Sequence, residues 1–192
     1  MEWDVGPADL PFRGDASSHG VLDSAVAFFP DLSPYGYFSD DVVADGPYSA
    51  SFVPAYHRIN VGWLSGQHRY TTGAGPEGLL GRLLDIIRWQ DVNSTRGFHV
   101  CELCPRGDTW TGLPTVEHKG DVLYLGTSEI RVPGAPGEVF AAPTLIAHYV
   151  GGHGYLPPVS FIDAVLRCPE GWMSGPDAPG VPSDATRSDY RR

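Results

Sequence analysis

The stretch GFHVCELCPRG, residues 97–107, places two cysteines three positions apart. Zinc sites commonly take one pair of ligands from a Cys-x2-Cys turn and a second pair from elsewhere in the chain. Pro105 disfavours helical geometry at Cys104, and Gly107 tolerates the positive φ angles of a tight turn. The stretch therefore predicts a zinc knuckle, to which the fold must bring two further ligands.

Two histidines in the stretch IAHYVGGH are candidates for the second pair. Together with Cys101 and Cys104, His148 and His153 give the pattern Cys-x2-Cys…His-x4-His, whose histidine spacing is typical of zinc sites. Residues 105–147 separate the two pairs, a gap far longer than in a zinc finger. We therefore expect zinc as the cofactor, with a small sheet folded between the two ligand pairs.

Two other interpretations of the cysteines remain open. A redox pair would need the first cysteine at the start of a helix, and two buried thiols would need no ligand at all. His99 alternates with Cys101 along a predicted strand, and Cys168 ends the last predicted helix, so both compete for a place on the metal. We expect His99 to be a strand histidine bonded to backbone and Cys168 to be a small buried residue.

The pattern of apolar residues predicts an α+β fold. It comprises a small antiparallel sheet with a zinc knuckle and three short helices. Knuckle, hairpin and helix follow in the order of a treble-clef-like metal site, although both histidines fall late on their predicted helix. The predicted helices span residues 75–89, 142–153 and 157–168, and the predicted strands span residues 56–64, 96–100, 121–126, 128–132 and 137–142.

The length of 192 residues suits one domain with tails. Residues 1–26 are acidic and rich in turn formers, which predicts a flexible N-terminal arm. Residues 169–192 are rich in Pro, Gly, Ser and Asp, which predicts a disordered C-terminal tail. The zinc-binding α+β domain is then residues 27–168.

The formal net charge of −10 excludes the usual electrostatic driving force for binding nucleic acid or an anionic membrane surface. The acidic start is unlike a secretory signal, and no apolar run is long enough for a membrane span. We therefore expect a cytoplasmic protein. Disulfides are rare in that compartment, and three cysteines fit a disulfide framework poorly.

Several blocks of sequence together resemble a family of short bacterial proteins classed as a domain of unknown function. The resemblance implies a compact bacterial domain in which Cys101, Cys104, His148 and His153 match recurrent motif positions, and it implies no activity. The long arm and tail depart from the short family pattern. The blocks are FFPDLSPYGYF (28–38), INVGWL (59–64), RGFHVCELC (96–104), LGTSEIRV (125–132) and VFAAPTLIAHYVGGHGYLPPVSFIDAV (139–165).

Two functional hypotheses follow from the predicted ligand set. Four protein ligands leave no open position on zinc, so the first is a binding or accessory module with a structural zinc site and a protein or peptide partner. The alternative is a metal-dependent enzyme, hydrolytic or tailoring, with an open zinc site near His148 and Tyr149. If the histidines were free of metal, His148 and Tyr149 could instead form an acid/base pair, which Glu102 or Glu129 could assist.

Two polar stretches could also line a binding site. FPDLSPY, residues 29–35, could rim a pocket, but Asx-turn chemistry before a proline explains it as well. GWLSGQHRYTTG, residues 62–73, could bind an anion or a peptide, and we expect it to be a solvated turn.

Overall fold

The computed structural model describes residues 27–45, 48–105, 114–173 and 190–191. The predicted arm, Gly107 and most of the predicted tail lie outside these described residues. The elements are β1 (Asp41–Asp45), β2 (Tyr48–Phe52), β3 (His57–Asn60), α1 (Leu79–Trp89), β4 (Thr115–His118), β5 (Asp121–Tyr124), β6 (Glu129–Pro133), β7 (Glu138–Pro143), α2 (Ile146–His153), α3 (Val159–Arg167) and β8 (Tyr190–Arg191).

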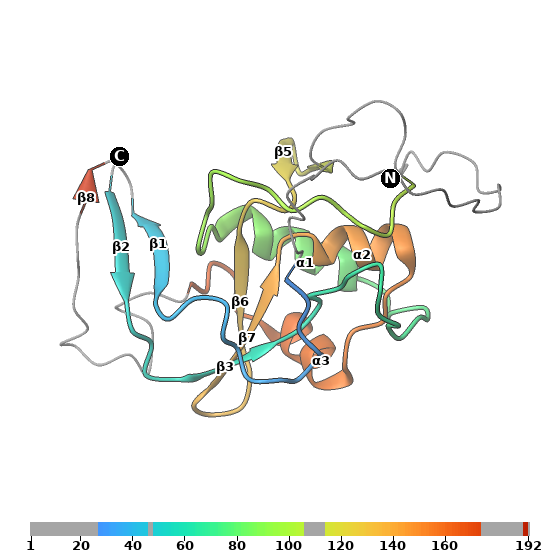
Figure 1. Ribbon diagram of the computed structural model, residues 1–192, viewed down its shortest axis with the longest axis horizontal. Helices are drawn as coiled ribbons and strands as arrows, with labels where there is room; N and C mark the ends of the chain where they lie inside the picture. The colour runs from blue at the N-terminus through green and yellow to red at the C-terminus, as the bar shows by residue number, and fades with distance from the viewer. Residues whose placement is uncertain (1–26, 46–47, 106–113, 174–189, 192) are drawn as a thin grey trace, which may run out of the picture.

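A three-stranded sheet in the order β3–β7–β6 forms the centre of the fold (Figure 1). β6 and β7 form the predicted antiparallel hairpin, whereas β3 runs parallel to β7 with Asn60 opposite Ala141. The predicted antiparallel sheet is therefore mixed, because the chain returns to β7 in the direction of β3 after a long connection through α1. The α+β class is confirmed.

One face of this sheet packs against helices. Residues of one face alternate along each strand, and Ile130, Val132 and Phe140 belong to the core shared with α1 and α3. The Phe140 ring meets the Phe161 ring of α3 edge-to-face at 5.5 Å. Each large apolar side chain buried in this way contributes about 1.5–3 kcal/mol to stability. From α1 the buried residues are Leu79, Leu83, Leu84, Ile86 and Ile87.

A network of buried charges covers the other face. The Arg131 guanidinium of β6, which is fully buried, donates to Asp41 of β1 at 2.7 Å and to Glu129 at 2.7 Å. Arg58 donates to the same Asp41 carboxylate at 2.8 Å and lies over the Tyr35 ring. These bonds fasten the segment before β1 across the sheet.

Helix boundaries differ from the prediction for local reasons. α1 starts at Leu79, and Pro76 is not its first residue, because Gly78 adopts a φ of +84° that a helix cannot contain. α2 starts only at Ile146, because Ala142 and Pro143 extend β7 and pair with β6. It then continues through both glycines to His153, and Gly154 ends it at a φ of +61°.

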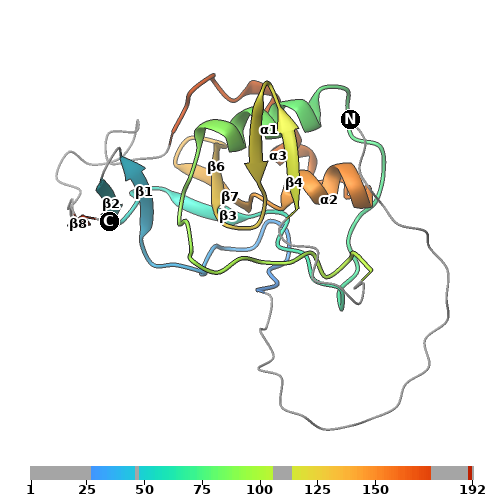
Figure 2. The same cartoon turned by 90° about the horizontal axis from the view of Figure 1, so that it is seen from above.

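The predicted strand at residues 96–100 is wrong. The Thr95 hydroxyl donates to the Gly97 carbonyl at 2.7 Å, which bends the chain, and the His99 N–H donates to the Gly126 carbonyl without forming a strand ladder. The strand predicted at residues 121–126 pairs instead with β4. This β4–β5 hairpin, of which β4 was not predicted, lies against α1 (Figure 2).

The start and the end of the predicted tail contact the body. The carbonyl of Trp172 accepts hydrogen bonds from Trp89 at 3.1 Å and from Gln90 at 3.0 Å. β8 adds to β2 in a second sheet of order β1–β2–β8. The backbone groups of these few tail residues thus pair with the domain.

Candidate metal centre

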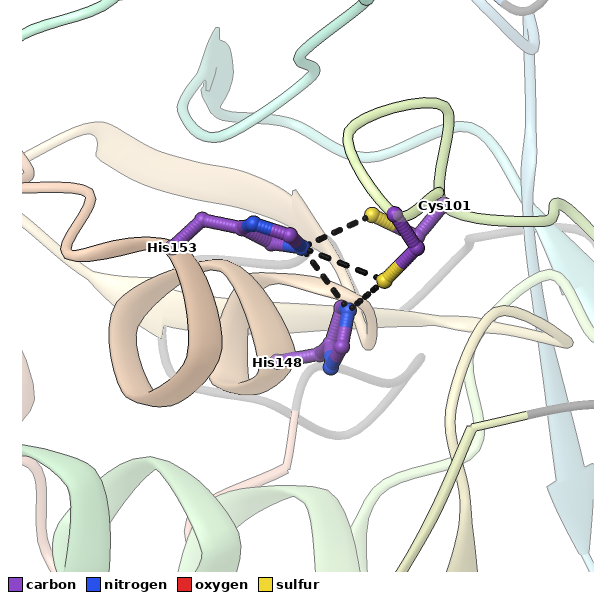
Figure 3. Close-up of side chains that lie close together, drawn as sticks. Cys101, His148 and His153 are labelled. Carbon is purple, nitrogen blue, oxygen red and sulfur yellow. Dashed lines mark hydrogen bonds between the residues drawn. The ribbon is translucent and has the colours of Figure 1, made fainter. Parts of the chain in front are cut away.

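Two cysteines and two histidines from distant parts of the chain converge at one point. Cys101 Sγ lies 3.2 Å from His153 Nε2, and Cys104 Sγ lies 3.2 Å from His148 Nε2. The two Nε2 atoms are 3.1 Å apart. All four candidate ligand atoms lie within 4.8 Å of one another. Figure 3 shows the knuckle and α2 facing each other across this Cys/His cluster.

The spacing of these atoms fits a single metal ion. For a tetrahedral ion bound at about 2.0–2.3 Å, neighbouring ligand atoms lie about 3.3–3.8 Å apart. The observed contacts of 3.1–3.3 Å are close to those edges. Two sulfur and two imidazole donors are also the set typical of tetrahedral metal sites. The four residues therefore could hold a metal ion.

Burial sets the protonation of the cluster. The pKa of the Cys101 thiol is raised to about 12 by burial and by the neighbouring Cys104. The pKa of His148 is lowered to about 4 by burial and by His153. Free of metal, the cluster thus contains a protonated Cys101 and a neutral His148. A cation that binds here must release the thiol proton, so its affinity falls at low pH.

The sequence around the cluster explains how α2 presents its histidines. Because the helix starts at Ile146, His148 lies in its first turn, and His153 is its last residue. The expectation that both histidines fall late on the helix is therefore wrong for His148. Gly152 leaves room beside the His148 ring, where an added Cβ would already touch Cε1 at 3.4 Å.

The knuckle is fixed to the domain on both sides. The Glu102 carboxylate accepts a hydrogen bond from the Gly66 N–H at 2.9 Å, which joins the knuckle to the loop after β3. The His99 N–H donates to the Gly126 carbonyl at 2.9 Å. Gly126 has a φ of +98°, and an added Cβ would lie 2.5 Å from the His99 oxygen. Only glycine therefore fits at this crossing.

The competing ligands lie outside the cluster. The His99 ring bonds the Tyr37 hydroxyl at 3.2 Å, so its partner is a side chain and not the backbone that we expected. Cys168 is buried at the C-terminal end of α3, with its sulfur 3.7 Å from the Pro169 carbonyl, as expected of a small buried residue. Cys101, Cys104 and Cys168 are all free thiols.

The candidate acid and base groups are also placed. Tyr149 is 2% exposed, and burial and the nearby Cys101 raise the pKa of its hydroxyl. Glu102 is bonded to Gly66, and Glu129 lies in the buried charge network of the sheet. None of these three side chains belongs to the Cys/His cluster found among the described residues.

The FPDLSPY stretch carries a turn anchored from a distance. The Asp31 carboxylate accepts bonds from the Tyr155 hydroxyl and the Gly62 N–H at 2.8 and 2.9 Å. It therefore acts across the fold and not as a local Asx turn. Next to it, Leu32 has a φ of +64° and is 52% exposed. In the other polar stretch, His68 bonds Ser65 at 2.7 Å within a local turn.

The chain also matches a known sequence family. The profile described as "Domain of unknown function (DUF7919)" matches residues 27–166. The chain belongs to this family. The resemblance to a domain of unknown function is thus confirmed, and all four residues of the Cys/His cluster lie within the DUF7919 match. No curated protein and no solved structure matches the chain.

The DUF7919 domain contains a second polar centre that sequence reasoning missed. Asp41, Glu129 and Arg131 are all buried, and they come from β1 and β6. A signal was present, since Glu129 and Arg131 are two apart in a strand and share one face.

Among the described helices, none is long and apolar enough to cross a membrane.

Proposed function

We propose that this DUF7919 protein is a zinc-stabilised binding or accessory module. The observation that supports it is the convergence of four protein donors, Cys101, Cys104, His148 and His153, on one point. Zinc favours this tetrahedral set of thiolates and imidazoles, whereas Mg²⁺ and Ca²⁺ favour oxygen. Two thiolates would neutralise the charge of the ion in this partly buried position.

The proposed zinc is structural and not catalytic. Catalytic zinc sites usually have three protein ligands and a bound water, and four protein donors leave no such position. The nearby carboxylate of Glu102 already accepts a bond from Gly66. A structural zinc can contribute up to the order of 10 kcal/mol to folding. Here we expect that contribution to be confined to the knuckle, because the central sheet and α1 share a buried core of their own.

A second candidate is a metal-dependent enzyme, hydrolytic or tailoring, near His148 and Tyr149. It is favoured by the incomplete burial of Cys104 and His153, through which solvent could reach a bound ion. Displacement of one of these two ligands by water would create an open site. Coordination number separates the two candidates.

The partner that we propose is a protein or peptide in the cytoplasm of a bacterium. The net charge of −10 disfavours nucleic acid and anionic membranes. Three free thiols fit a reducing compartment. The oligomeric state stays outside the proposal.

Metal analysis of the purified chain tests the zinc proposal. We expect one zinc ion per chain in the parent protein, and background levels in Cys101→Ser and His153→Ala. Cys168→Ser is the matched control, because Cys168 is a buried thiol away from the cluster, and it should retain the zinc. Background zinc in the parent, or full zinc in Cys101→Ser, would refute the proposed site.

Cobalt substitution distinguishes the structural from the catalytic candidate. Co²⁺ bound by two sulfurs and two nitrogens gives the intense visible absorption of a tetrahedral ion. A spectrum that stays unchanged on addition of azide or cyanide supports four protein ligands. A spectrum that shifts on addition of either anion supports the enzyme candidate, since only an open position can accept an external ligand.

A further inference from the structure

A small pocket opens next to the charge network, between the segment before β1 and the start of β6. Its volume is about 20 Å³, and about 10–15 Å³ on the same measure accommodates one water molecule. The pocket therefore admits a group of roughly the size of water. Its walls include Tyr37, Trp63, Thr95, His99, Ser128 and Glu129.

Aromatic rings form one side of this pocket. Tyr37 and Trp63 are 5.0 Å apart between ring centroids and inclined at 50°, and Tyr37 and His99 are 6.1 Å apart at 64°. The Trp63 indole N–H already donates to the Ala141 carbonyl at 3.1 Å. A ligand in the pocket would therefore contact the carbon atoms of the Trp63 ring and not its N–H. Faces of Trp and Tyr rings attract cations.

A buried carboxylate also lines the pocket. Glu129 is 3% exposed, and its oxygens accept bonds from Arg131 at 2.7 Å and from the Tyr35 hydroxyl at 3.0 Å. The Asn93 side-chain amide donates to the same carboxylate at 3.4 Å. A carboxylate has about four acceptor positions, so these three donors leave one for a further donor. The pKa of the Tyr37 hydroxyl is raised by burial and then by the Glu129 charge, and both residues line this pocket.

We propose that this pocket binds a primary ammonium group. Such a group is the size of a water molecule, carries a positive charge for the rings and has three donors for Glu129 and its neighbours. The small volume excludes a trimethylammonium group, and the Glu129 charge excludes a carboxylate ligand. The group belongs either to a small alkylamine or to a lysine side chain of a partner. The site is separate from the Cys/His cluster, so it does not depend on the zinc proposal.

Protein-observed NMR on the full, metal-loaded chain tests the site. Methylammonium chloride, at up to about 50 mM for a weak millimolar ligand, should shift the Trp63 indole N–H and the Ser128 amide saturably. Tetramethylammonium chloride and sodium chloride at equal ionic strength should leave both signals in place. Equal shifts with all three salts, or no saturable shift, would overturn the proposal.

A lysine ligand identifies the source of the ammonium group. Nα-acetyl-lysine amide that binds about tenfold more tightly than methylammonium, a gain of about 1.4 kcal/mol, supports a lysine side chain. Equal affinities support a small free amine. Both outcomes uphold the ammonium site, because both depend on the same charged head group.

Substitutions of pocket residues test whether methylammonium binds in this pocket. Glu129→Gln removes the charge and should weaken methylammonium binding at least about tenfold. Because Glu129 also pairs with Arg131, this variant could fail to fold. Tyr37→Leu, at a half-buried position, then decides, with Tyr124→Leu as the matched control because Tyr124 is 59% exposed on β5. Unchanged binding by Tyr37→Leu contradicts the proposal.

Discussion

Individual residues of the Cys/His cluster were predicted from the sequence, whereas the pairing of Asp41 with Arg131 in the charge network was not. A Cys-x2-Cys turn is a local pattern whose chemistry is specific, and the structure brings Cys101 and Cys104 to the predicted histidines. Asp41 and Arg131 are 90 positions apart and carry no such pattern. Only the fold shows that each is the partner of the other.

The Asp41 carboxylate should be the most costly single acid to neutralise. In Asp41→Asn the fully buried Arg131 loses one of its two charged partners and keeps Glu129, and we expect a loss of about 3 kcal/mol in unfolding free energy. Chemical denaturation at neutral pH measures this. Asp163→Asn is the control, because the exposed Asp163–Arg167 pair at 3.9 Å should contribute less than about 0.5 kcal/mol.

The difference in unfolding free energy between the parent protein and Asp41→Asn should depend on pH. Burial raises the pKa of Asp41, but Arg131 and Arg58 more than offset it, so the net shift is downward. A lowered acid pKa contributes stability above the unfolded value and loses it as the pH falls through the folded value. The difference between parent and Asp41→Asn should therefore shrink below about pH 4. A constant difference from pH 7 to 3 would contradict this account.

At the scale of elements, the sequence predicts that a helix exists more reliably than it predicts where the helix starts and ends. Apolar periodicity locates α1 and α3, whose buried faces repeat about every 3.6 residues. Four consecutive residues are buried in α2, which was expected from Pro143 and the Gly151–Gly152 pair instead. The starts of helices depend on single backbone angles, as at Gly78, which a periodic pattern does not register. The strand expected at residues 96–100 fails for a similar reason, since the Thr95 hydroxyl bends the chain.

Gly126, between β5 and β6, should be far less replaceable than Gly120, in the turn between β4 and β5. Both have positive φ, but an added Cβ meets the His99 oxygen at 2.5 Å only at Gly126, and nothing within 4 Å at Gly120. We expect Gly126→Ala to cost about 3 kcal/mol or more and Gly120→Ala about 1–2 kcal/mol. Urea unfolding of both variants measures the difference.

Gly126→Ala should also weaken metal binding, because His99 leads directly into the knuckle at Cys101. Competition with a chromophoric chelator gives the zinc affinity of each variant. Equal affinities and equal stabilities of the two alanine variants would show that the chain adjusts freely at this crossing.

The whole molecule joins a well-packed core to a knuckle that lies outside the helices and strands. The core between the sheet and α1 and α3 is buried, and Cys101 of the knuckle belongs to it. Hydrogen bonds also link the knuckle to the domain, from Gly66 to Glu102 and from His99 to Gly126. The parallel pairing of β3 with β7 is a property of the whole molecule. No local pattern specifies it, because it depends on how the chain returns after α1.

Metal removal should therefore loosen one part of the molecule before the rest. After chelation we expect faster amide exchange at residues 62–73 and 97–105, while β6, β7 and α1 remain protected. Hydrogen exchange with mass spectrometry measures this, with chelator added to Cys101→Ser as a control that should show no further change. A uniform loss of protection, or none, would contradict this division.

The turn at Leu32 has a consequence for evolution. Its φ of +64° is held by the anchored Asp31, while half of its side chain faces solvent. A left-handed backbone costs a β-branched residue more than any other, and glycine or asparagine least. Across homologues, the residues allowed at position 32 should thus depend on branching at Cβ and not on hydrophobicity. Val, Ile and Thr should be absent from this position, and Gly and Asn should be accepted.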